Sequence, residues 1–155
     1  MSSIIAKGIT KKYRETEALK NVDLTVDSGK IYGMIGRNGA GKTTLLSILS
    51  SQNPATSGEV MLDGEKVWEN QKAIDRICFS REIATSTPFG PNVAKIKDYL
   101  KAAEIFYPNW DKEYAARLVK TFKLEPKKKV NKLSKGMLSM VTIIIALASR
   151  AEFTF

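Results

Sequence analysis

The sequence predicts an α/β fold, in which a P-loop nucleotide-binding core with antiparallel β elements is followed by an α-helical subdomain. The first supporting observation is a glycine-rich segment, residues 36–43, between a short apolar stretch (30–35) and an amphipathic stretch (44–49). The second is a change of character after residue 84, where short apolar runs give way to longer stretches with apolar residues at helical spacing. This order indicates an α/β part and then a helical part.

The glycine-rich segment fits the pattern of Gly, four residues and Gly-Lys-Ser/Thr that wraps the phosphates of a nucleotide. Backbone N–H groups must point inward at an anion there, and glycine leaves room for the bend and for the phosphate. The lysine places a positive charge against the phosphates, and the next hydroxyl is an oxygen ligand suited to Mg²⁺. The alternative is a glycine-rich turn that binds nothing. The candidate nucleotide-binding residues of this segment are Gly36, Arg37, Asn38, Gly39, Ala40, Gly41, Lys42, Thr43 and Thr44.

Short strands are predicted on both sides of this segment. Residues 4–10 and 18–26 alternate loosely and predict two strands joined by a polar turn at 11–17. The apolar stretch 30–35 predicts a strand that leads into the loop, and 44–49 predicts the helix that follows it. Further along, 59–62 and 65–68 flank Asp63-Gly64, a two-residue hairpin signal, and the apolar run 77–80 predicts one more short strand.

The second half of the chain predicts helices. Residues 85–92 are rich in Pro, Ser, Thr and Gly and predict a loop; amphipathic helices are expected at about 93–106 and 111–122. Asp111 falls in the first turn of the latter, where a negative charge is favourable. A third helix is expected at about 135–150, and because it is unusually apolar we expect it to be buried on most sides.

Composition limits the function classes. With 155 residues the chain has the length of about one domain, and no apolar run approaches a membrane span. There is no histidine and a single cysteine, Cys78, so a zinc site and an internal disulfide are not expected and a reducing cytoplasm is the natural compartment. The net charge of +9 is compatible with anionic partners, but basic and aromatic residues do not interleave, so no nucleic-acid partner is expected. The run 127–129 is interpreted as a solvated loop, and Trp68 as a packing residue.

Taken together, these motifs resemble the ATP-binding subunit of an ABC transporter over essentially the whole chain. The loop at 36–43 resembles the Walker A segment of that family, and Tyr13 stands where the family places the aromatic residue that stacks on adenine. Residues 56–64 resemble the β-hairpin that follows the Walker A helix. Leu133-Ser134-Lys135-Gly136-Met137 resembles the signature motif, usually Leu-Ser-Gly-Gly-Gln, at the head of an apolar helix.

The resemblance implies ATP and Mg²⁺ as cofactors, a second ATP-binding subunit in a head-to-tail dimer, and a transmembrane permease as partner. It implies that Ser134, Lys135 and Gly136 reach the nucleotide bound by the other subunit, and it places the chain in the cytoplasm at the inner face of the cell membrane. Two alternatives stay open: Ser134 as a plain helix N-cap and Tyr13 as an aromatic that covers apolar surface.

Three positions depart from the family pattern. Lys135 and Met137 replace a glycine and the glutamine of the signature; the lysine keeps an attraction to phosphate, and the methionine removes a polar contact. Where the family places a glutamine that helps to hold Mg²⁺, this sequence has Glu82, so Thr43 and Glu82 are the candidate metal ligands. Such variants, together with residues 106–111, resemble the ABC-2 type export branch of the family.

The sequence ends where family members continue into the strand of the Walker B aspartate, the general-base glutamate and the switch histidine. No catalytic residue is identified, and we expect a truncated domain that binds ATP without efficient hydrolysis. Because buried parallel strands need neighbours, we also expect apolar surface around the loop strand and at 143–147 to be uncovered. The predicted division is an incomplete ATP-binding core (1–84 and 134–155) and a helical signature subdomain (85–133).

Three functions follow as hypotheses. The first is an ATP-binding, energy-coupling subunit of a membrane exporter. The second is a nucleotide-binding fragment or regulatory pseudo-ATPase without turnover. The third, a P-loop kinase or GTPase, would leave Tyr13 and Leu133-Ser134-Lys135-Gly136 as coincidences.

Overall fold

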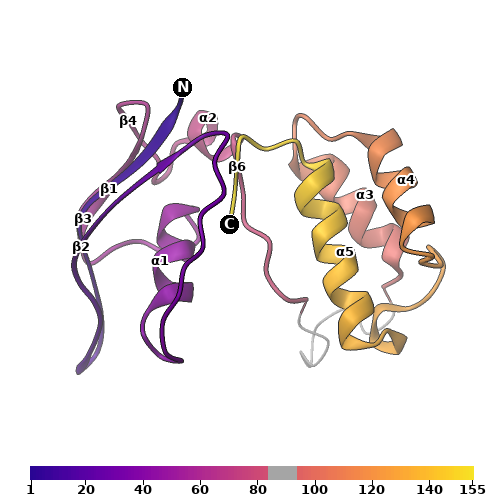
Figure 1. Cartoon of the computed structure of the whole chain (residues 1–155), viewed down its shortest axis with the longest axis horizontal. Coiled ribbons are helices and arrows are strands. Elements are labelled where there is room, and N and C mark those ends of the chain that lie inside the picture. Colours follow the sequence, from indigo (N-terminus) through magenta and orange to yellow (C-terminus); the bar gives the residue numbers. More distant parts are fainter. Residues whose placement is uncertain (84–93) are drawn as a thin grey trace. The chain divides into compact units, whose positions relative to one another are not determined.

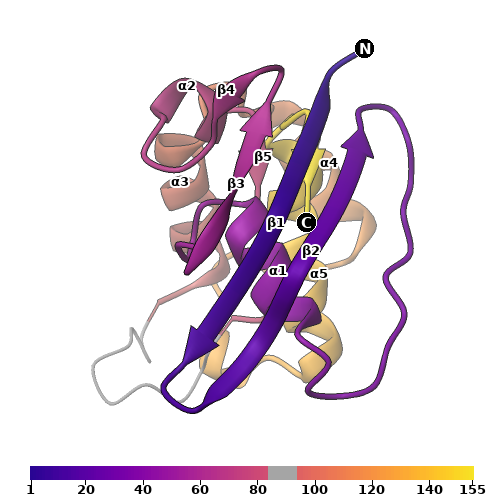
Figure 2. The same ribbon diagram turned by 90° about the vertical axis from the view of Figure 1, so that its left-hand side faces the viewer.

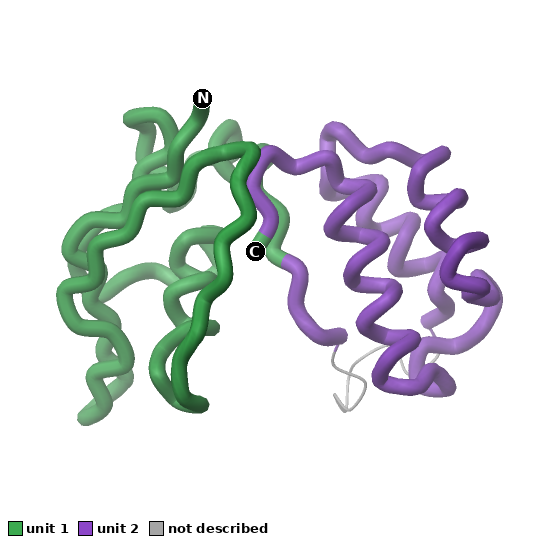
Figure 3. The backbone as a smooth tube through the Cα atoms, in the orientation of Figure 1, with its two compact units in different colours: residues 1–79, 155 green, residues 80–154 purple. Residues whose placement is uncertain are grey.

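A computed structural model describes residues 1–83 and 94–155 of the chain. These residues form two compact units: residues 1–79 with 155, and residues 80–154 (Figure 3). The second unit therefore includes 134–154 together with the helices before them, whereas the sequence analysis assigned 134–155 to the ATP-binding core. That predicted division into core and subdomain stays a prediction.

The first unit is built on a four-stranded antiparallel sheet in the order β2-β1-β3-β4 (Figure 2). Strand β1 (Ser3–Tyr13) lies between β2 (Thr16–Asp27) and β3 (Ser57–Leu62), and β4 (Glu65–Lys66) pairs with β3. The predicted strands at 4–10, 18–26 and 59–62 are confirmed. The predicted polar turn at 11–17 is wrong in extent, because cross-strand pairs continue to Tyr13 opposite Thr16.

An irregularity at Gly8 explains why even-numbered residues of β1 are buried before it and odd-numbered residues after it. Ile4 and Ala6 are buried in the first half of the strand, and Ile9 and Lys11 in the second. The pairing register with β2 shifts between Ala6 and Ile9, and Gly8 lies there with a positive φ of 61°. One extra residue in a strand moves the following side chains to the opposite face, so this bulge brings Lys11 inward.

The hairpin predicted at Asp63-Gly64 is confirmed. Both residues have positive φ, 51° and 87°, as a two-residue turn between twisted antiparallel strands requires. The Asp63 carboxylate accepts hydrogen bonds from the backbone N–H of Ser3 (2.9 Å) and from Arg76 (2.7 Å). The turn is thereby tied to the start of β1 and to the segment after the hairpin.

Helix α1 (Lys42–Leu49) lies against one face of this sheet and fills its core (Figures 1 and 2). Leu45, Ile48 and Leu49 are its buried residues, at the spacing of one helical face. The short α2 (Gln71–Ile74), which is capped by the Asn70 side chain, was not predicted from the sequence. The predicted strand at 77–80 is reduced to β5 (Ile77–Cys78).

The strand predicted at 30–35 is wrong. These residues form no regular element, and Ile35 is 98% exposed. A parallel strand is held by hydrogen bonds to neighbouring strands, and none of the strands in residues 1–83 and 94–155 pairs with this segment. What fixes it locally is Asp27, whose carboxylate accepts from Lys30 Nζ at 2.7 Å and from the Tyr32 hydroxyl at 3.3 Å.

The second unit contains the predicted helices. They are α3 (Ile96–Phe106), α4 (Lys112–Thr121) and α5 (Lys135–Ala148), with a short 3₁₀ turn, η1 (Val130–Lys132), before α5 and the two-residue β6 (Phe153–Thr154) after it. The loop predicted at 85–92 lies outside the described residues. The buried core of this unit consists of Ile96, Ala115, Val119, Leu124, Val141, Ile144 and Ala148.

Burial of α5 on most sides, expected from its apolar sequence, is wrong. One stripe of the helix is buried, but Ile143 and Leu147 are 45% and 46% exposed. Within the second unit α3 and α4 cover one face of α5, and Ile143 and Leu147, four positions apart on another face of the helix, are left open. The exposure that we expected at 143–147 is therefore present. Among the described residues, no helix combines the length and the apolar character that crossing a bilayer requires.

An ion pair fastens the start of α4 to the end of α5. Asp111 caps α4 through a hydrogen bond from the backbone N–H of Tyr114 (2.8 Å), and its Oδ2 accepts from Arg150 Nη2 at 2.7 Å. The Arg150 guanidinium also lies 4.3 Å from the centre of the Tyr114 ring. The hydrogen bond from Tyr114, followed by that from Arg150, lowers the pKa of Asp111 below its ordinary value of 3.8.

We expect Asp111→Asn to weaken the second unit in a pH-dependent way. Because the folded-state pKa of Asp111 is lowered, its contribution to the free energy of unfolding is complete above the unfolded-state value of 3.8 and is lost as the pH falls through the folded-state pKa. Urea unfolding followed by circular dichroism should therefore show wild type more stable than the variant near neutral pH, with a gap that closes in acid.

The matched control is Glu113→Gln, which removes an exposed acid from the same first helical turn. A gap between wild type and Asp111→Asn that stays constant with pH, or that equals the gap for the control, would contradict this account.

Candidate functional site

The glycine-rich segment joins the irregular residues 30–35 to α1, and glycine is required where the helix begins. Gly41 is the N-cap of α1 and has a left-handed φ of 85°. A Cβ placed on Gly41 would lie 2.5 Å from the backbone oxygen of Ala18 and 2.8 Å from Leu19 Cδ2. The loop is thus pressed against β2, and any side chain at this position would force the two backbones apart.

The Lys42 side chain crosses the loop rather than pointing away from it. Its Nζ donates to the carbonyl oxygens of Gly36 (2.5 Å) and Arg37 (2.8 Å). A Cβ built on Gly36 would lie 3.7 Å from Lys42 Cδ, an ordinary van der Waals contact, so the lysine stem passes close to the Gly36 backbone. The structure therefore holds an ammonium group inside a bend of the backbone, as a phosphate-binding loop requires.

Several donors around this ammonium have no partner in the described part of the chain. The Ala40 N–H donates to the Arg37 oxygen at 3.1 Å, but the N–H groups of Gly39, Lys42 and Thr43 make no such bond within residues 1–83 and 94–155. The first N–H groups of a helix lack intrahelical acceptors, and with the helix dipole they favour an anion. The residues Gly36 to Ala40 are all exposed, as is Thr43, so the loop is open to a ligand.

Tyr13 is the candidate base-stacking residue, and it ends β1 opposite Thr16 of β2. Two residues after Thr16, β2 reaches Ala18, whose carbonyl oxygen lies against Gly41. Tyr13 as a whole is 46% exposed. The Tyr13 hydroxyl accepts a hydrogen bond from Asn53 Nδ2 at 2.6 Å, and Lys11 Nζ lies 5.1 Å from the ring centre. The ring is thus held in place while part of it faces solvent.

Sequence reasoning missed the two residues that hold Tyr13. Lys11 is buried, and its Nζ donates to the side-chain oxygen of Asn53 (2.9 Å) and to the carbonyl oxygen of Pro54 (2.5 Å). Lys11 shares a face of β1 with Tyr13 because alternate strand residues point the same way. No signal in the sequence pairs Asn53 with Tyr13, since forty positions separate them.

The signature-like segment opens α5 in the second unit. Ser134 is the N-cap of α5 and accepts a hydrogen bond from the Met137 backbone N–H at 3.3 Å, so its capping role is confirmed. Ser134, Lys135 and Gly136 are exposed, and nothing lies within 4 Å of a Cβ built on Gly136. Lys135 Nζ is 4.0 Å from Glu82 Oε1, with both side chains well exposed, so this pair is loose.

The metal assignment stays a prediction. Thr43 belongs to the first compact unit and Glu82 to the second. Within the described residues no group of three or more His, Cys, Asp or Glu residues gathers as a metal cluster would. Of the predicted site residues, 36–43 form one loop, which contacts β2, the strand that pairs with Tyr13. Ser134, Lys135 and Gly136 lie at the start of a different helix, α5.

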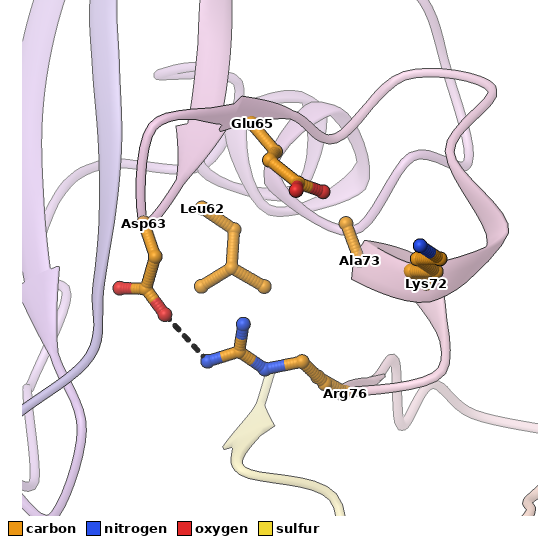
Figure 4. A pocket seen from close by; sticks show the side chains of 6 residues that line it. All are labelled: Leu62, Asp63, Glu65, Lys72, Ala73 and Arg76. Atoms are coloured by element: carbon orange, nitrogen blue, oxygen red, sulfur yellow. Dashed lines mark hydrogen bonds and ion pairs between the residues drawn. The ribbon is translucent and has the colours of Figure 1, made fainter.

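A separate cavity of about 230 Å³ lies beside the hairpin in the first unit (Figure 4). Asp63 and Arg76 form an ion pair across it at 2.7 Å, and the Arg76 hydrogen bond is the largest cause that lowers the pKa of Asp63. Glu65 and Lys72 add one charge of each sign. This cavity lacks the converging positive charge that a nucleotide phosphate needs, and its ion pair ties the hairpin to the segment after α2.

Comparison with known proteins agrees with this geometry. The family model described as "ABC transporter" matches residues 19–155. The chain is 29% identical over 142 residues to the ABC transporter ATP-binding protein YtrB of Bacillus subtilis (strain 168), covering 92% of this chain and 47% of that protein. It is 50% identical over 58 residues to the ribose import ATP-binding protein RbsA of Yersinia pestis, covering 37% of this chain and 11% of that protein. The chain thus spans about half the length of YtrB and a smaller part of RbsA.

A solved structure shows the same fold. The ATP-binding cassette MJ0796, in a dimeric post-hydrolysis state bound to ADP and Pi, superposes with a TM-score of 0.79 at 25% identity. The match covers 97% of this chain and 72% of that one. The predicted P-loop α/β fold class is therefore confirmed.

We expect Gly41→Ala to destabilise the first unit by about 2–5 kcal/mol, because the substitution combines a left-handed φ with overlap against the Ala18 backbone. Gly39→Ala is the matched control: φ is 83° there, but nothing lies within 4 Å of a Cβ, so only the conformational cost of about 1–2 kcal/mol remains. The free energy of unfolding in urea measures both. Equal losses in the two variants would show that the approach to β2 does not constrain the loop.

Proposed function

The chain belongs to the ABC transporter family, and we propose that it is the ATP-binding, energy-coupling part of a transporter. The observation that carries the proposal is the Lys42 ammonium held inside the 36–43 bend, beside N–H groups that make no hydrogen bond within the described residues. Positive charge and converging donors at a helix N-terminus are what the β- and γ-phosphates of ATP require.

The rest of the nucleotide is assigned from the surroundings of the loop. The exposed ring of Tyr13 supplies an aromatic face for adenine, held by Asn53 and Lys11. The Thr43 hydroxyl makes no hydrogen bond within residues 1–83 and 94–155 and directly follows Lys42, so it suits Mg²⁺ bound with the phosphates. When bound, the metal neutralises phosphate charge, and Glu82 is the second ligand in this proposal.

The head of α5 is proposed to contact the nucleotide of a second subunit. Ser134 leaves its hydroxyl exposed at a helix N-terminus, Gly136 leaves open space beside it, and Lys135 adds positive charge. An end of this kind favours an anion. The MJ0796 cassette, which is described as dimeric and as bound to ADP and Pi, supports a dimer as the state in which this end acts.

The proposed setting is the cytoplasmic face of a membrane, reached through a permease subunit. Support comes from the named relatives, which are ATP-binding proteins of transporters. The direction of transport stays a prediction: the sequence analysis favoured export, whereas RbsA is named an import protein and matches over 58 residues.

We expect Lys42→Ala to lower ATP affinity at least a hundredfold, because a charge-assisted contact to phosphate is lost. Titration of a fluorescent ATP analogue with Mg²⁺ measures this, and Lys20→Ala, an exposed lysine on β2, is the matched control. Equal affinity of the wild type and Lys42→Ala would contradict the assignment of the loop. Phosphate release from the same samples separates an energy-coupling ATPase from a module that binds ATP without turnover.

We expect Tyr13→Ala to lower ATP affinity about tenfold and Tyr13→Phe to leave it within a few-fold, since base stacking on an aromatic ring contributes about 1–3 kcal/mol. Trp68→Ala is the matched control. Trp68 was expected to be a packing residue, but it is 44% exposed in the same unit and has no proposed role in nucleotide binding. Competition with GTP and with triphosphate alone shows whether the loss arises at the base. If Tyr13→Ala also weakened the binding of triphosphate alone, Tyr13 would be assigned to the stability of the loop instead.

A further inference from the structure

Positive charge is concentrated in one part of this chain. Residues 94–135 hold twelve Lys or Arg and five Asp or Glu, a surplus of seven out of the net +9 of the whole chain. The sequence run 127–129 is the densest point, and by itself such a run is typical of a solvated loop.

The structure adds two more lysines to that run from thirty residues away. Lys95 pairs with Lys129 in an isolated antiparallel bridge. The Ile96 N–H donates to the Lys128 oxygen (3.1 Å), and the Lys97 N–H donates to the Pro126 oxygen (3.0 Å). Residues opposite one another in an antiparallel pair have Cβ atoms about 5 Å apart, so like charges are held together here at an electrostatic cost. We call Lys95, Lys97, Lys127, Lys128 and Lys129 the lysine platform.

The lysine platform has no ion-pair partner among residues 1–83 and 94–155. The Asp98 carboxylate is engaged by the backbone N–H of Lys95 at 2.8 Å, and the neighbouring sequence 84–93 contains no Asp or Glu. Lys97, Lys127 and Lys129 are exposed.

From this clustering we propose that the lysine platform binds anionic lipid headgroups of the membrane. The inference rests on the proposed function, which brings the chain to the cytoplasmic leaflet, where anionic lipids attract polybasic segments. A permease loop is a poor match, since cytoplasmic loops of membrane proteins carry excess Lys and Arg and would repel the platform. Single-stranded nucleic acid is also disfavoured, because the five residues offer no aromatic ring for base stacking.

The test is binding of the whole chain to sedimented vesicles, without nucleotide. We expect binding to vesicles of phosphatidylcholine with about a third phosphatidylserine, little binding to pure phosphatidylcholine, and loss of binding as salt rises past the physiological range. Lys97, Lys127 and Lys129 changed together to Gln should weaken binding on the order of a hundredfold, at about 1 kcal/mol per lysine.

The matched control changes Lys7, Lys20 and Lys72, three exposed lysines of the first unit, to Gln, with the same change in net charge. Equal loss in both triple variants, or no preference for anionic vesicles, would overturn the proposal, and so would displacement of the protein from vesicles by an equimolar oligonucleotide. Thermal unfolding of both variants checks that they fold as wild type does. ATP titration of the wild-type chain keeps the outcomes apart: ATP binding without a preference for anionic vesicles rejects the lipid site alone, and binding to anionic vesicles without ATP binding rejects the nucleotide site.

Discussion

The close approach of Gly41 to the backbone of β2 is the constraint on which the phosphate-binding loop depends. Without a Cβ, Gly41 adopts a left-handed conformation and starts α1 against the Ala18 carbonyl. Leu45, Ile48 and Leu49 then pack into the core of the first unit. The position of the loop is therefore set by helix packing on one side and strand contact on the other, and Lys42 can hold its ammonium inside the bend.

The same strand contact relates the phosphate site to the proposed base site. β2 leaves the hairpin at Thr16, opposite Tyr13, and reaches the Gly41 contact at Ala18. Lys11 and Asn53 hold the Tyr13 ring from the neighbouring side. The bulge at Gly8 is needed for this arrangement, because it turns Lys11 inward and so brings its ammonium to Asn53.

Charge is distributed unevenly between the two units, and the nucleotide site does not account for the positive surplus of the second unit. Two acids of the first unit form local ion pairs: Asp27 with Lys30, and Asp63 with Arg76. In the second unit the Asp111–Arg150 pair joins α4 to α5, while the lysine platform has no such counterpart among the described residues. Backbone hydrogen bonds hold the two segments that carry these five lysines together, so their positive charges repel one another in the folded chain. A negatively charged surface would reduce this repulsion.

Local signals in the sequence determined much of this protein. The glycine and lysine spacing at 36–43, the Asp63-Gly64 turn and the Ser134 cap each act over a few residues, so they could be predicted without knowing the fold. The interactions of Tyr13 with Asn53 and of Lys95 with Lys129 join distant segments, and only the tertiary structure decided them. Two of the errors have the same origin: residues 30–35 and the outer face of α5 are apolar enough for burial, but burial requires a neighbour, and hydrophobic periodicity does not say whether one is present.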